Sequence, residues 1–227
     1  MTRSIFITGT DTDAGKTFVA AALLKRAYAL GLTTAGYKPV AAGCDTTAEG
    51  LRNSDALVLQ SESHPSLSYL EVNPIAFEAP IAPHIAAALE GRSISLAEIS
   101  QGYQHLYTQH PDFLVVEGAG GWRLPLGDQR FMSDFVIQHK IPVLLVVGLK
   151  LGCLNHAILT REAVLKDGLE VVGWIGNHID PDMLYGQENI ASLRDMFPEP
   201  CLGIIPHLKG HQDASDFLAD ADAYLTT

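Results

Sequence analysis

The sequence predicts an α/β fold in which a mostly parallel β-sheet carries helices on both faces. Three observations favour it: short apolar runs alternate with helical patterns, apolar residues form 47% of the chain, and charged residues form only 18%. Strands of a parallel sheet are buried on both faces and therefore form continuous apolar runs, and their alternation with helices is typical of crossover connections. One large sheet of this kind can absorb 227 residues, so we expect a single domain over residues 1–227.

A strand, a loop and a helix open the chain. Residues 5–7 (Ile-Phe-Ile) form a short apolar run, and a turn rich in glycine and aspartate follows it. The Ala/Leu-rich stretch at residues 17–30 then has the spacing of a helix, which Gly31 ends. This order is typical of the first unit of a parallel sheet.

Further strands and helices alternate along the rest of the chain. Apolar runs predict strands at residues 33–38, 113–117, 143–147, 171–175 and 202–205. Spaced apolar positions predict helices near residues 54–60, 95–109, 155–166, 188–196 and 214–224. The segment at residues 42–89 contains four prolines and is longer than most connections, so we expect a functional excursion there.

Charge and cysteine usage exclude several classes of protein. The formal net charge is -11 with no cluster of Lys or Arg, whereas nucleic acid or an anionic membrane attracts a basic surface. Cys44, Cys153 and Cys201 are widely spaced and form no CxxC pair, which favours a reducing cytoplasm over a disulfide or zinc framework. The longest apolar run, residues 141–149, is too short to cross a membrane, and the first strand leaves no room for a signal peptide. We therefore expect a soluble cytoplasmic protein that binds neither nucleic acid nor a membrane.

Residues 9–17 (Gly-Thr-Asp-Thr-Asp-Ala-Gly-Lys-Thr) form the strongest motif in the chain. They end in Gly-Lys-Thr and lie between a strand and a helix, which is the context of a phosphate-binding loop. In such a loop Gly15 allows close approach of the backbone, Lys16 reaches the outer phosphates and the Thr17 hydroxyl can bind Mg²⁺. Thr10 stands where the first glycine is usual. We predict a fold like that of the P-loop nucleoside triphosphatases, with a nucleoside triphosphate and magnesium bound at this loop.

Several further positions have both a functional and a structural interpretation. Glu117 ends an apolar strand, and at the carboxyl edge of a parallel sheet its carboxylate could bind Mg²⁺ or simply be solvated. Asp55 lies at a helix start, where capping is the stronger interpretation, and Lys38 ends a strand, where a surface lysine is common. His207 and His211 have no third metal ligand nearby, so we interpret them as loop residues.

Five segments, taken together, resemble the dethiobiotin synthetase family. Besides residues 9–17 they are residues 36–40 (Gly-Tyr-Lys-Pro-Val), 50–56 (Gly-Leu-Arg-Asn-Ser-Asp-Ala), 116–121 (Val-Glu-Gly-Ala-Gly-Gly) and 152–156 (Gly-Cys-Leu-Asn-His). They follow the family's order and spacing from the first strand to about residue 180, and the match weakens after Asn177.

The resemblance implies a ligase of biotin biosynthesis that closes the ureido ring of dethiobiotin. Its substrates would be diaminopelargonic acid, carbon dioxide and ATP, with Mg²⁺ as cofactor, and it would act as a homodimer with the substrate site at the subunit interface. A substrate amine would capture carbon dioxide as a carbamate, and the carbamate oxygen would attack the γ-phosphate to give a carbamic-phosphoric mixed anhydride. The second amine would then displace phosphate.

The resemblance also assigns roles to individual residues. The catalytic residues that it implies are Thr12, Lys16 and Lys38. The ATP contacts that it implies are Asp13, Ala14, Gly15, Lys16, Thr17, Phe18 and Glu117, with Asn177, Pro206, His207 and Leu208 around the adenine base. The Mg²⁺ ligands that it implies are Thr17, Asp55 and Glu117. The substrate contacts that it implies are Thr12, Lys38, Ala42, Gly118, Gly152, Cys153, Leu154 and Asn155. The last four begin a helix, whose free N–H groups can hold the distal carboxylate of the substrate. Ala42 stands where the family usually has a serine, so a hydroxyl contact to the substrate is missing.

Two other classes of protein use similar phosphate loops. A partitioning or positioning ATPase carries a signature lysine where Asp11 stands here, and it usually needs a basic or amphipathic targeting surface. An ATP-dependent amidoligase of the cobyrinic type normally carries a glutamine amidotransferase domain, for which we expect no room in 227 residues. Stimulation of ADP release by diaminopelargonate with bicarbonate would distinguish the synthetase from both classes.

Overall fold

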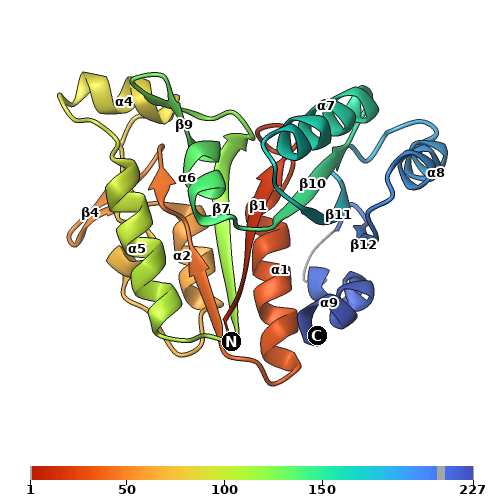
Figure 1. The fold of residues 1–227 in the computed structure, drawn as a ribbon, viewed down its shortest axis with the longest axis horizontal. Coiled ribbons are helices and arrows are strands. Elements are labelled where there is room, and N and C mark those ends of the chain that lie inside the picture. Colours follow the sequence, from red (N-terminus) through yellow and green to blue (C-terminus); the bar gives the residue numbers. More distant parts are fainter. Residues whose placement is uncertain (1, 209–212, 227) are drawn as a thin grey trace.

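A six-stranded parallel sheet forms the centre of the computed structural model, which describes residues 2–208 and 213–226. The strands are β1 (Arg3–Gly9), β2 (Thr34–Tyr37), β7 (Phe113–Gly121), β10 (Val143–Leu149), β11 (Val171–His178) and β12 (Cys201–Ile205). Their order is β12-β11-β10-β1-β7-β2, and every neighbouring pair is parallel. The strands form the middle of the molecule in Figure 1. The predicted α/β fold with a mostly parallel sheet is thus confirmed.

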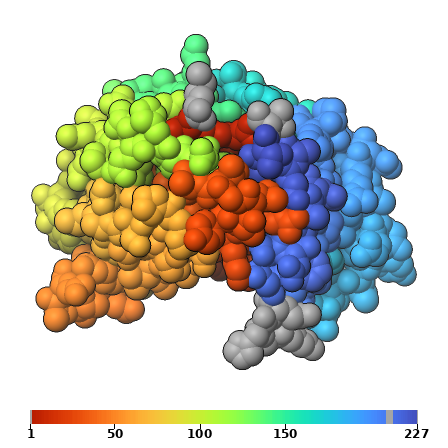
Figure 2. Space-filling view, turned by 90° about the horizontal axis from the view of Figure 1, so that it is seen from below, coloured from red at the N-terminus to blue at the C-terminus, as the bar shows by residue number. Residues whose placement is uncertain are grey.

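Helices cover both faces of this sheet. They are α1 (Lys16–Ala29), α2 (Ser54–Ser61), α3 (Tyr69–Val72), α4 (Pro83–Leu89), α5 (Leu96–Thr108), α6 (Met132–His139), α7 (Cys153–Lys166), α8 (Gly186–Met196) and α9 (Asp222–Thr226). Seen from below in Figure 2, the green and teal segments lie along one side of the molecule and the orange and dark blue segments along the opposite side. Among the described residues, no helix combines the length and the apolar character that crossing a bilayer requires.

Three short two-stranded sheets lie outside the central one. They pair β3 (Val40–Ala41) with β6 (Ile75–Ala76), β4 (Asp45–Thr47) with β5 (Gly50–Arg52), and β8 (Pro125–Gly127) with β9 (Arg130–Phe131). The first two belong to the proline-containing excursion predicted at residues 42–89 and its approach, which also folds into α2, α3 and α4. This excursion leaves the sheet after β2 and returns through α5 to β7 (Figure 1). Asp55, at the start of α2, lies near the carboxyl end of β7, whereas His64 pairs with Thr34 at the amino end of β2.

The core lies on both sides of β1, the strand at the middle of the sheet. The side chains of Ile5, Phe6 and Ile7 are at most 2% exposed, in accordance with the apolar run that predicted this strand. A second cluster packs α7 and α8 against the far strands, where the rings of Trp174 and Phe197 meet edge to face with centroids 6.2 Å apart. Burial of these large rings contributes strongly to stability, because each removes a large apolar area from water.

The C-terminal segment does not form the helix predicted at residues 214–224. It forms two 3-10 turns, Ala214–Phe217 and Ala219–Ala221, and then the short α9. Asp213 caps the first turn by accepting a hydrogen bond from the Ser215 N–H, and Asp222 pairs with Arg26 of α1 through two bonds of 2.7 and 2.6 Å. The contacts with α1 override the helical spacing, which is a common outcome because propensity is weaker than tertiary packing.

Helices α4 and α6 were not predicted from the sequence. Helix α4 begins with Pro83 at its first position, where a missing N–H costs nothing. In α6 the carboxylate of Asp134 accepts the N–H of Phe131, 3.0 Å away, and so closes the first turn. The strand predicted at residues 113–117 also continues to Gly121, past a register irregularity against β1.

Candidate active site

The phosphate-binding loop lies on the carboxyl end of β10 and runs into α1. The Thr10 N–H donates to the Val146 carbonyl at 2.9 Å, and the Gly148 N–H donates to the Thr10 hydroxyl at 3.3 Å. Gly15 has a φ of +88°, and a Cβ added there would lie 2.1 Å from the Asn177 amide nitrogen. Only glycine fits this position, because a side chain would be strained and would also collide with its neighbour.

Lys16 is a buried lysine at the start of α1. Its side-chain ammonium donates to the Asp11 carbonyl at 3.1 Å, and within the described part of the chain it forms no ion pair. Burial lowers the pKa of Lys16, and the nearby charge of Lys38 lowers it further. An ammonium without a carboxylate partner at a helix N-terminus is suited to an anion, because the free N–H groups and the helix dipole add to its field.

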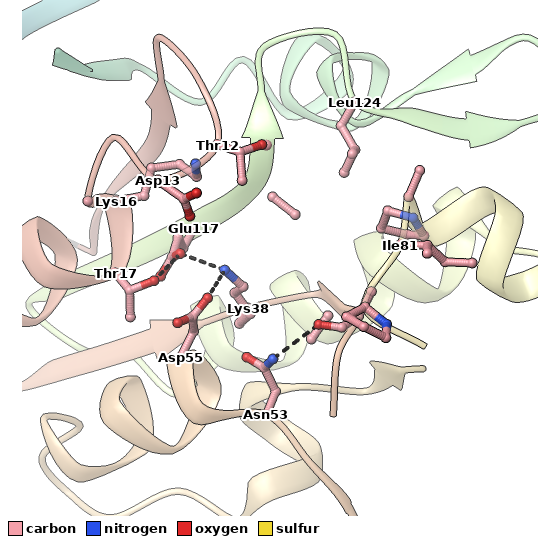
Figure 3. Close-up of a pocket in the computed structure, with 18 of the residues that line it drawn as sticks. Thr12, Asp13, Lys16, Thr17, Lys38, Asn53, Asp55, Ile81, Glu117 and Leu124 are labelled. Atoms are coloured by element: carbon pink, nitrogen blue, oxygen red, sulfur yellow. Dashed lines mark hydrogen bonds and ion pairs between the residues drawn. The ribbon is translucent and has the colours of Figure 1, made fainter. Parts of the chain in front are cut away.

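Four side chains next to this loop form a connected cluster. The Lys38 ammonium lies 2.6 Å from Glu117 Oε1 and 3.0 Å from Asp55 Oδ2. The Thr17 hydroxyl donates to the same Glu117 Oε1 at 2.7 Å. Figure 3 shows the Lys38 ammonium pointing between the two carboxylates, with Thr17 on the opposite side of Glu117. The side chains of Lys38 and Glu117 are 5% and 0% exposed, whereas that of Asp55 is 42% exposed.

The fold brings the members of the cluster together from distant parts of the sequence. Strand β2 pairs with β7 so that Tyr37 lies opposite Val116, which puts the next residues, Lys38 and Glu117, side by side. The backbone of Lys38 is held from both sides, because its N–H donates to the Val72 carbonyl at 2.8 Å and its own carbonyl accepts the Asn73 amide at 2.6 Å. The side chain is therefore aimed by the excursion as well as by the sheet.

Asp55 reaches the cluster from the first turn of α2. The N-cap of this helix is Asn53, whose side-chain oxygen accepts the Ala56 N–H at 3.2 Å. The carboxylate of Asp55 is not the capping group and points toward Lys38 instead. The interpretation of Asp55 as a capping residue is corrected accordingly: the acid lies in the first turn, and Asn53 caps.

Lys38 remains charged in spite of its burial. Burial alone lowers its pKa, but the charges of Glu117 and Asp55, together with their hydrogen bonds, raise the pKa above the ordinary value for lysine. An ammonium held this way is a fixed positive charge at neutral pH. The ammonium groups of Lys16 and Lys38 thus place two positive charges beside the phosphate-binding loop.

The residues beside the loop fit a hard divalent cation. Within the part of the chain that the structure describes, Glu117 Oε2 is a buried oxygen with no hydrogen-bond partner, and the candidate ligands Thr17, Asp55 and Glu117 offer only oxygen atoms. Mg²⁺ prefers such oxygens and is usually held by one or two carboxylates together with the phosphates of a nucleotide. In residues 2–208 and 213–226, no group of three or more His, Cys, Asp or Glu side chains is arranged to hold a metal by itself. Any metal here would accordingly need further oxygens, from water or phosphate, to complete its shell.

A cavity of about 760 Å³ opens over the cluster. One side carries the polar and charged side chains of Thr12, Asp13, Lys16, Thr17, Lys38, Asn53, Asp55 and Glu117, together with Gly15 and Phe18. The rest is mostly apolar and includes Ala41, Ala42, Pro80, Ile81, Ala82, Pro83, Ala119, Gly120 and Leu124. In Figure 3, Ile81 and Leu124 lie across the cavity from Thr17. Of the apolar wall only Ala42 was predicted individually, as a substrate contact, although the prolines at residues 80 and 83 belong to the excursion that was predicted to be functional.

The residues predicted at the base lie at the same edge of the sheet. Asn177 is in β11 opposite Ile205 of β12, so Pro206 follows beside it. The Asn177 amide donates to the Ala14 carbonyl of the loop at 3.1 Å. His207 contacts the His178 carbonyl through Nδ1 at 3.2 Å, and Leu208 packs against the core. His211, interpreted as a loop residue, lies outside the described residues.

Two groups of predicted substrate contacts do not line the cavity. Gly118 packs against Phe6, whose ring would lie 2.8 Å from an added Cβ. The segment Gly152 to Asn155 forms the start of α7, where Gly152 is the N-cap with φ of +92° and the Cys153 side chain is buried in the second core cluster. Neither group is among the lining residues. The helix begins at Cys153, two residues before the predicted start.

One contact of the loop was missed by sequence reasoning. Lys150, between β10 and α7, lies 3.1 Å from Asp11 Oδ2, while Asp11 Oδ1 accepts the Thr12 N–H at 2.8 Å. The Lys150 contact lowers the pKa of Asp11. Nothing in the local pattern indicates this pair, because its members are 139 residues apart.

Comparison with solved structures shows a fold shared with other nucleotide-binding proteins. The septum site-determining protein MinD of Pyrococcus horikoshii in complex with Mg-ADP has a TM-score of 0.56 and 18% identity over 100% of this chain and 97% of its own. The MinC:MinD complex of Aquifex aeolicus has a TM-score of 0.63 and 15% identity, with coverage of 98% and 95%. At such identities the likeness concerns the fold alone.

Comparison of sequences is more specific. A family model described as an AAA domain matches residues 3–215. The ATP-dependent dethiobiotin synthetase BioD of Cellvibrio japonicus is 52% identical over 221 residues, which cover 97% of this chain and 93% of that protein. The protein of the same name from Aeromonas salmonicida is 50% identical over 214 residues, with coverage of 94% and 95%. The chain therefore belongs to the ATP-dependent dethiobiotin synthetase family.

Proposed function

We propose that the chain converts 7,8-diaminopelargonic acid, carbon dioxide and ATP into dethiobiotin, ADP and phosphate, with Mg²⁺. The observation that carries the proposal is the position of two buried lysines, Lys16 and Lys38, at one cavity with a phosphate loop and the acids Asp55 and Glu117. Such a site binds and neutralises phosphate groups without offering a protein nucleophile, and this is what phosphoryl transfer needs.

The reaction proceeds in three steps. One substrate amine adds to carbon dioxide and loses a proton, which gives a carbamate. A carbamate oxygen attacks the γ-phosphorus, the bond to the bridging oxygen breaks, and ADP leaves. The second amine then attacks the carbonyl carbon of the mixed anhydride, loses its proton and expels phosphate, which closes the ureido ring.

The residues of the chain position and neutralise the reacting groups. The free N–H groups at the start of α1 hold the phosphates, and Lys16 stabilises the negative charge that spreads over the transferring phosphoryl group. Lys38 holds the carbamate oxygen in line with the phosphorus, and Thr12 contacts the same region of the cavity. Thr17, Asp55 and Glu117 would hold Mg²⁺, which neutralises phosphate charge when it is bound.

The shape of the cavity suits a diamine on an aliphatic chain. The apolar wall with Ile81 and Leu124 lies opposite the charged cluster, so it can pack along methylene groups while the amines face Lys38. Residues Gly152 to Asn155 do not line this cavity, so we propose that they hold the distal carboxylate of a substrate bound in a second copy. The proposed enzyme is thus a homodimer.

The proposed setting is a single-domain enzyme of the cytoplasm that has no nucleic-acid or membrane partner. The thiols of Cys44, Cys153 and Cys201 are all unpaired, which suits a reducing compartment. The formal net charge of -11 disfavours binding to polyanionic surfaces.

Incubation of the purified protein with Mg-ATP, bicarbonate and diaminopelargonate tests the function. Mass spectrometry is expected to detect dethiobiotin, with one ADP formed for each ring closed. Omission of the diamine should stop ADP release, because the carbamate is the acceptor. Steady ADP release without the diamine, and no dethiobiotin, would instead indicate an ATPase switch and would refute the proposal.

Ala42→Ser is expected to leave kcat unchanged and to lower the KM for the diamine by at most about tenfold, the value of one added hydrogen bond. Ala42 lines the cavity, and a hydroxyl there can donate to the substrate. Steady-state kinetics at saturating ATP measure the effect. Ala41→Ser on the same wall is the matched control, and a tenfold rise in KM for Ala42→Ser would contradict a substrate contact at this position.

Asn177→Ala is expected to raise the KM for ATP about tenfold and to reduce the preference for ATP over GTP, because it removes the amide proposed to bind adenine. The same amide bonds to Ala14, so the change could also disturb the loop. Inorganic triphosphate, which lacks a base, distinguishes these effects. Its affinity should stay the same if Asn177 acts on the base, and an equal loss for ATP and triphosphate would contradict that role.

A further inference from the structure

The Lys38 ammonium contacts the same carboxylates that would hold the metal. It lies 2.6 Å from Glu117 and 3.0 Å from Asp55, and these are the two carboxylates expected to hold Mg²⁺. Glu117 Oε1 already accepts a second hydrogen bond from Thr17, the third candidate ligand. One ammonium thus contacts both carboxylates of the candidate ligand set and offsets one of their two negative charges.

A divalent cation and this ammonium would compete for the same carboxylate oxygens. Both would lie within about 4 Å of the same oxygens, and the repulsion between them is large where water is largely excluded, as it is around Lys38 and Glu117. For the cation to bind, the ammonium needs another anionic partner. The γ-phosphate and the carbamate offer one in the same cavity, because Lys38 and the phosphate loop line it together.

We propose that Lys38 makes this metal site selective for the metal–nucleotide complex over the free cation. Without nucleotide, the ammonium pairs with Asp55 and with Glu117 Oε1 and so disfavours binding of free Mg²⁺. When Mg-ATP binds, the metal replaces Lys38 as the charged partner of Asp55 and Glu117. Lys38 then turns to the carbamate and the transferring phosphoryl group, which become its anionic partners. The inference rests on the proposed function of this site, and it adds that the positioning of the catalytic lysine and the binding of the metal are one coupled event.

The test measures binding of Mn²⁺ as a probe, by electron paramagnetic resonance, with and without the non-hydrolysable analogue AMP-PNP. In the wild type, free Mn²⁺ should bind weakly. Lys38→Met and Lys38→Gln remove the competing charge and should tighten binding of free Mn²⁺ by about 5- to 150-fold, the usual range of coupling between two ligands. Lys38→Arg keeps a cation and should bind as weakly as the wild type.

Two control variants locate the effect. Lys150→Met removes another lysine that pairs with an aspartate at 3.1 Å, but Asp11 is not a candidate ligand, so binding of free Mn²⁺ should not change. In the double variant with Lys38→Met and Glu117→Gln, the gain should disappear. Equal Mn²⁺ affinity in the wild type and both neutral variants would overturn the inference, and so would a gain that survives loss of Glu117.

A measurement on the wild type stands independently of the stability of the variants. With ¹⁵N-labelled lysine, the Nζ signal of Lys38 should shift on addition of Mg-AMP-PNP and stay in place with Mg²⁺ alone. A full shift with Mg²⁺ alone would overturn the inference. Formation of dethiobiotin is assayed separately: its absence would count against the proposed function, whereas the cation measurements would still decide whether Lys38 excludes the free metal.

Discussion

Lys16→Met is expected to lower kcat about 10³-fold while the protein stays folded. Methionine keeps the apolar stem of the side chain and removes only the ammonium that faces the phosphate loop. Loss of one preorganised charge or donor at a transition state typically costs 10²–10³ in kcat, and charges on a transferring phosphoryl group reach higher values. Dethiobiotin formation under saturating ATP and diamine gives the number.

The melting temperature of Lys16→Met distinguishes this loss of kcat from a loss caused by unfolding. Burial and the charge of Lys38 lower the pKa of Lys16, so the folded protein holds this proton less tightly than the unfolded chain does. Below the ordinary pKa of lysine the charge therefore costs folding free energy, and its removal should leave the melting temperature unchanged or higher. Lys25→Met, on the exposed side of the same helix, is the control and should keep full activity. A Lys16→Met variant with wild-type kcat would refute the proposed chemistry.

Local patterns were sufficient to predict the phosphate loop and most strands. Residues 9–17 combine an apolar run, a glycine-rich turn and a helix start within a few positions, and each of these signals is local. The strands near Phe6, Val115 and Val146 are recognisable because strands buried on both faces contain almost no polar residue. The ends of α1, α2, α5, α7 and α8 were predicted to within two residues, because helix starts and apolar spacing are also local signals.

The cluster beside the loop could not be predicted from local patterns. Lys38 and Glu117 are 79 residues apart, and their contact depends on the pairing of β2 with β7, which the sequence does not specify. Read alone, Lys38 and Asp55 had ordinary structural interpretations, and only the family resemblance suggested functions for them. Their roles, like that of Asn177, stay predictions until the variants are measured. The wrong helix at residues 214–224 has the same origin, because pairing of Arg26 with Asp222 is a tertiary contact.

Glu117→Gln is expected to lower kcat/KM for Mg-ATP by about 10²–10³ and to raise the Mg²⁺ concentration needed for half-maximal rate. The amide oxygen can still accept the hydrogen bonds of Thr17 and Lys38. The amide nitrogen then takes the place of Oε2, the buried oxygen that has no hydrogen-bond partner among the described residues, and an amide nitrogen has no free lone pair for a metal. The flipped amide would point its N–H groups at the Lys38 ammonium, which can only donate, so this orientation is disfavoured.

The variant should also lose stability, because Lys38 keeps only Asp55 as a charged partner. Breaking a buried pair costs roughly 3–5 kcal/mol, and the retained hydrogen bonds favour the lower end of that range. Glu199→Gln is the matched control: Glu199 is 12% exposed and pairs with Arg161 at 2.7 Å, away from the cavity. It should lose stability without any change in the Mg²⁺ requirement.

Excess Mg²⁺ distinguishes a metal ligand from a purely structural acid. Glu117→Gln leaves Thr17, Asp55 and the nucleotide phosphates, so high Mg²⁺ should partly restore its rate, whereas Lys16→Met should not respond, because its missing charge is not a ligand. A Glu117→Gln enzyme with wild-type Mg²⁺ dependence would mean that the carboxylate serves only to hold Lys38. In that case the loss of kcat would have to arise from a misplaced ammonium, and Lys38→Gln would reproduce it in full.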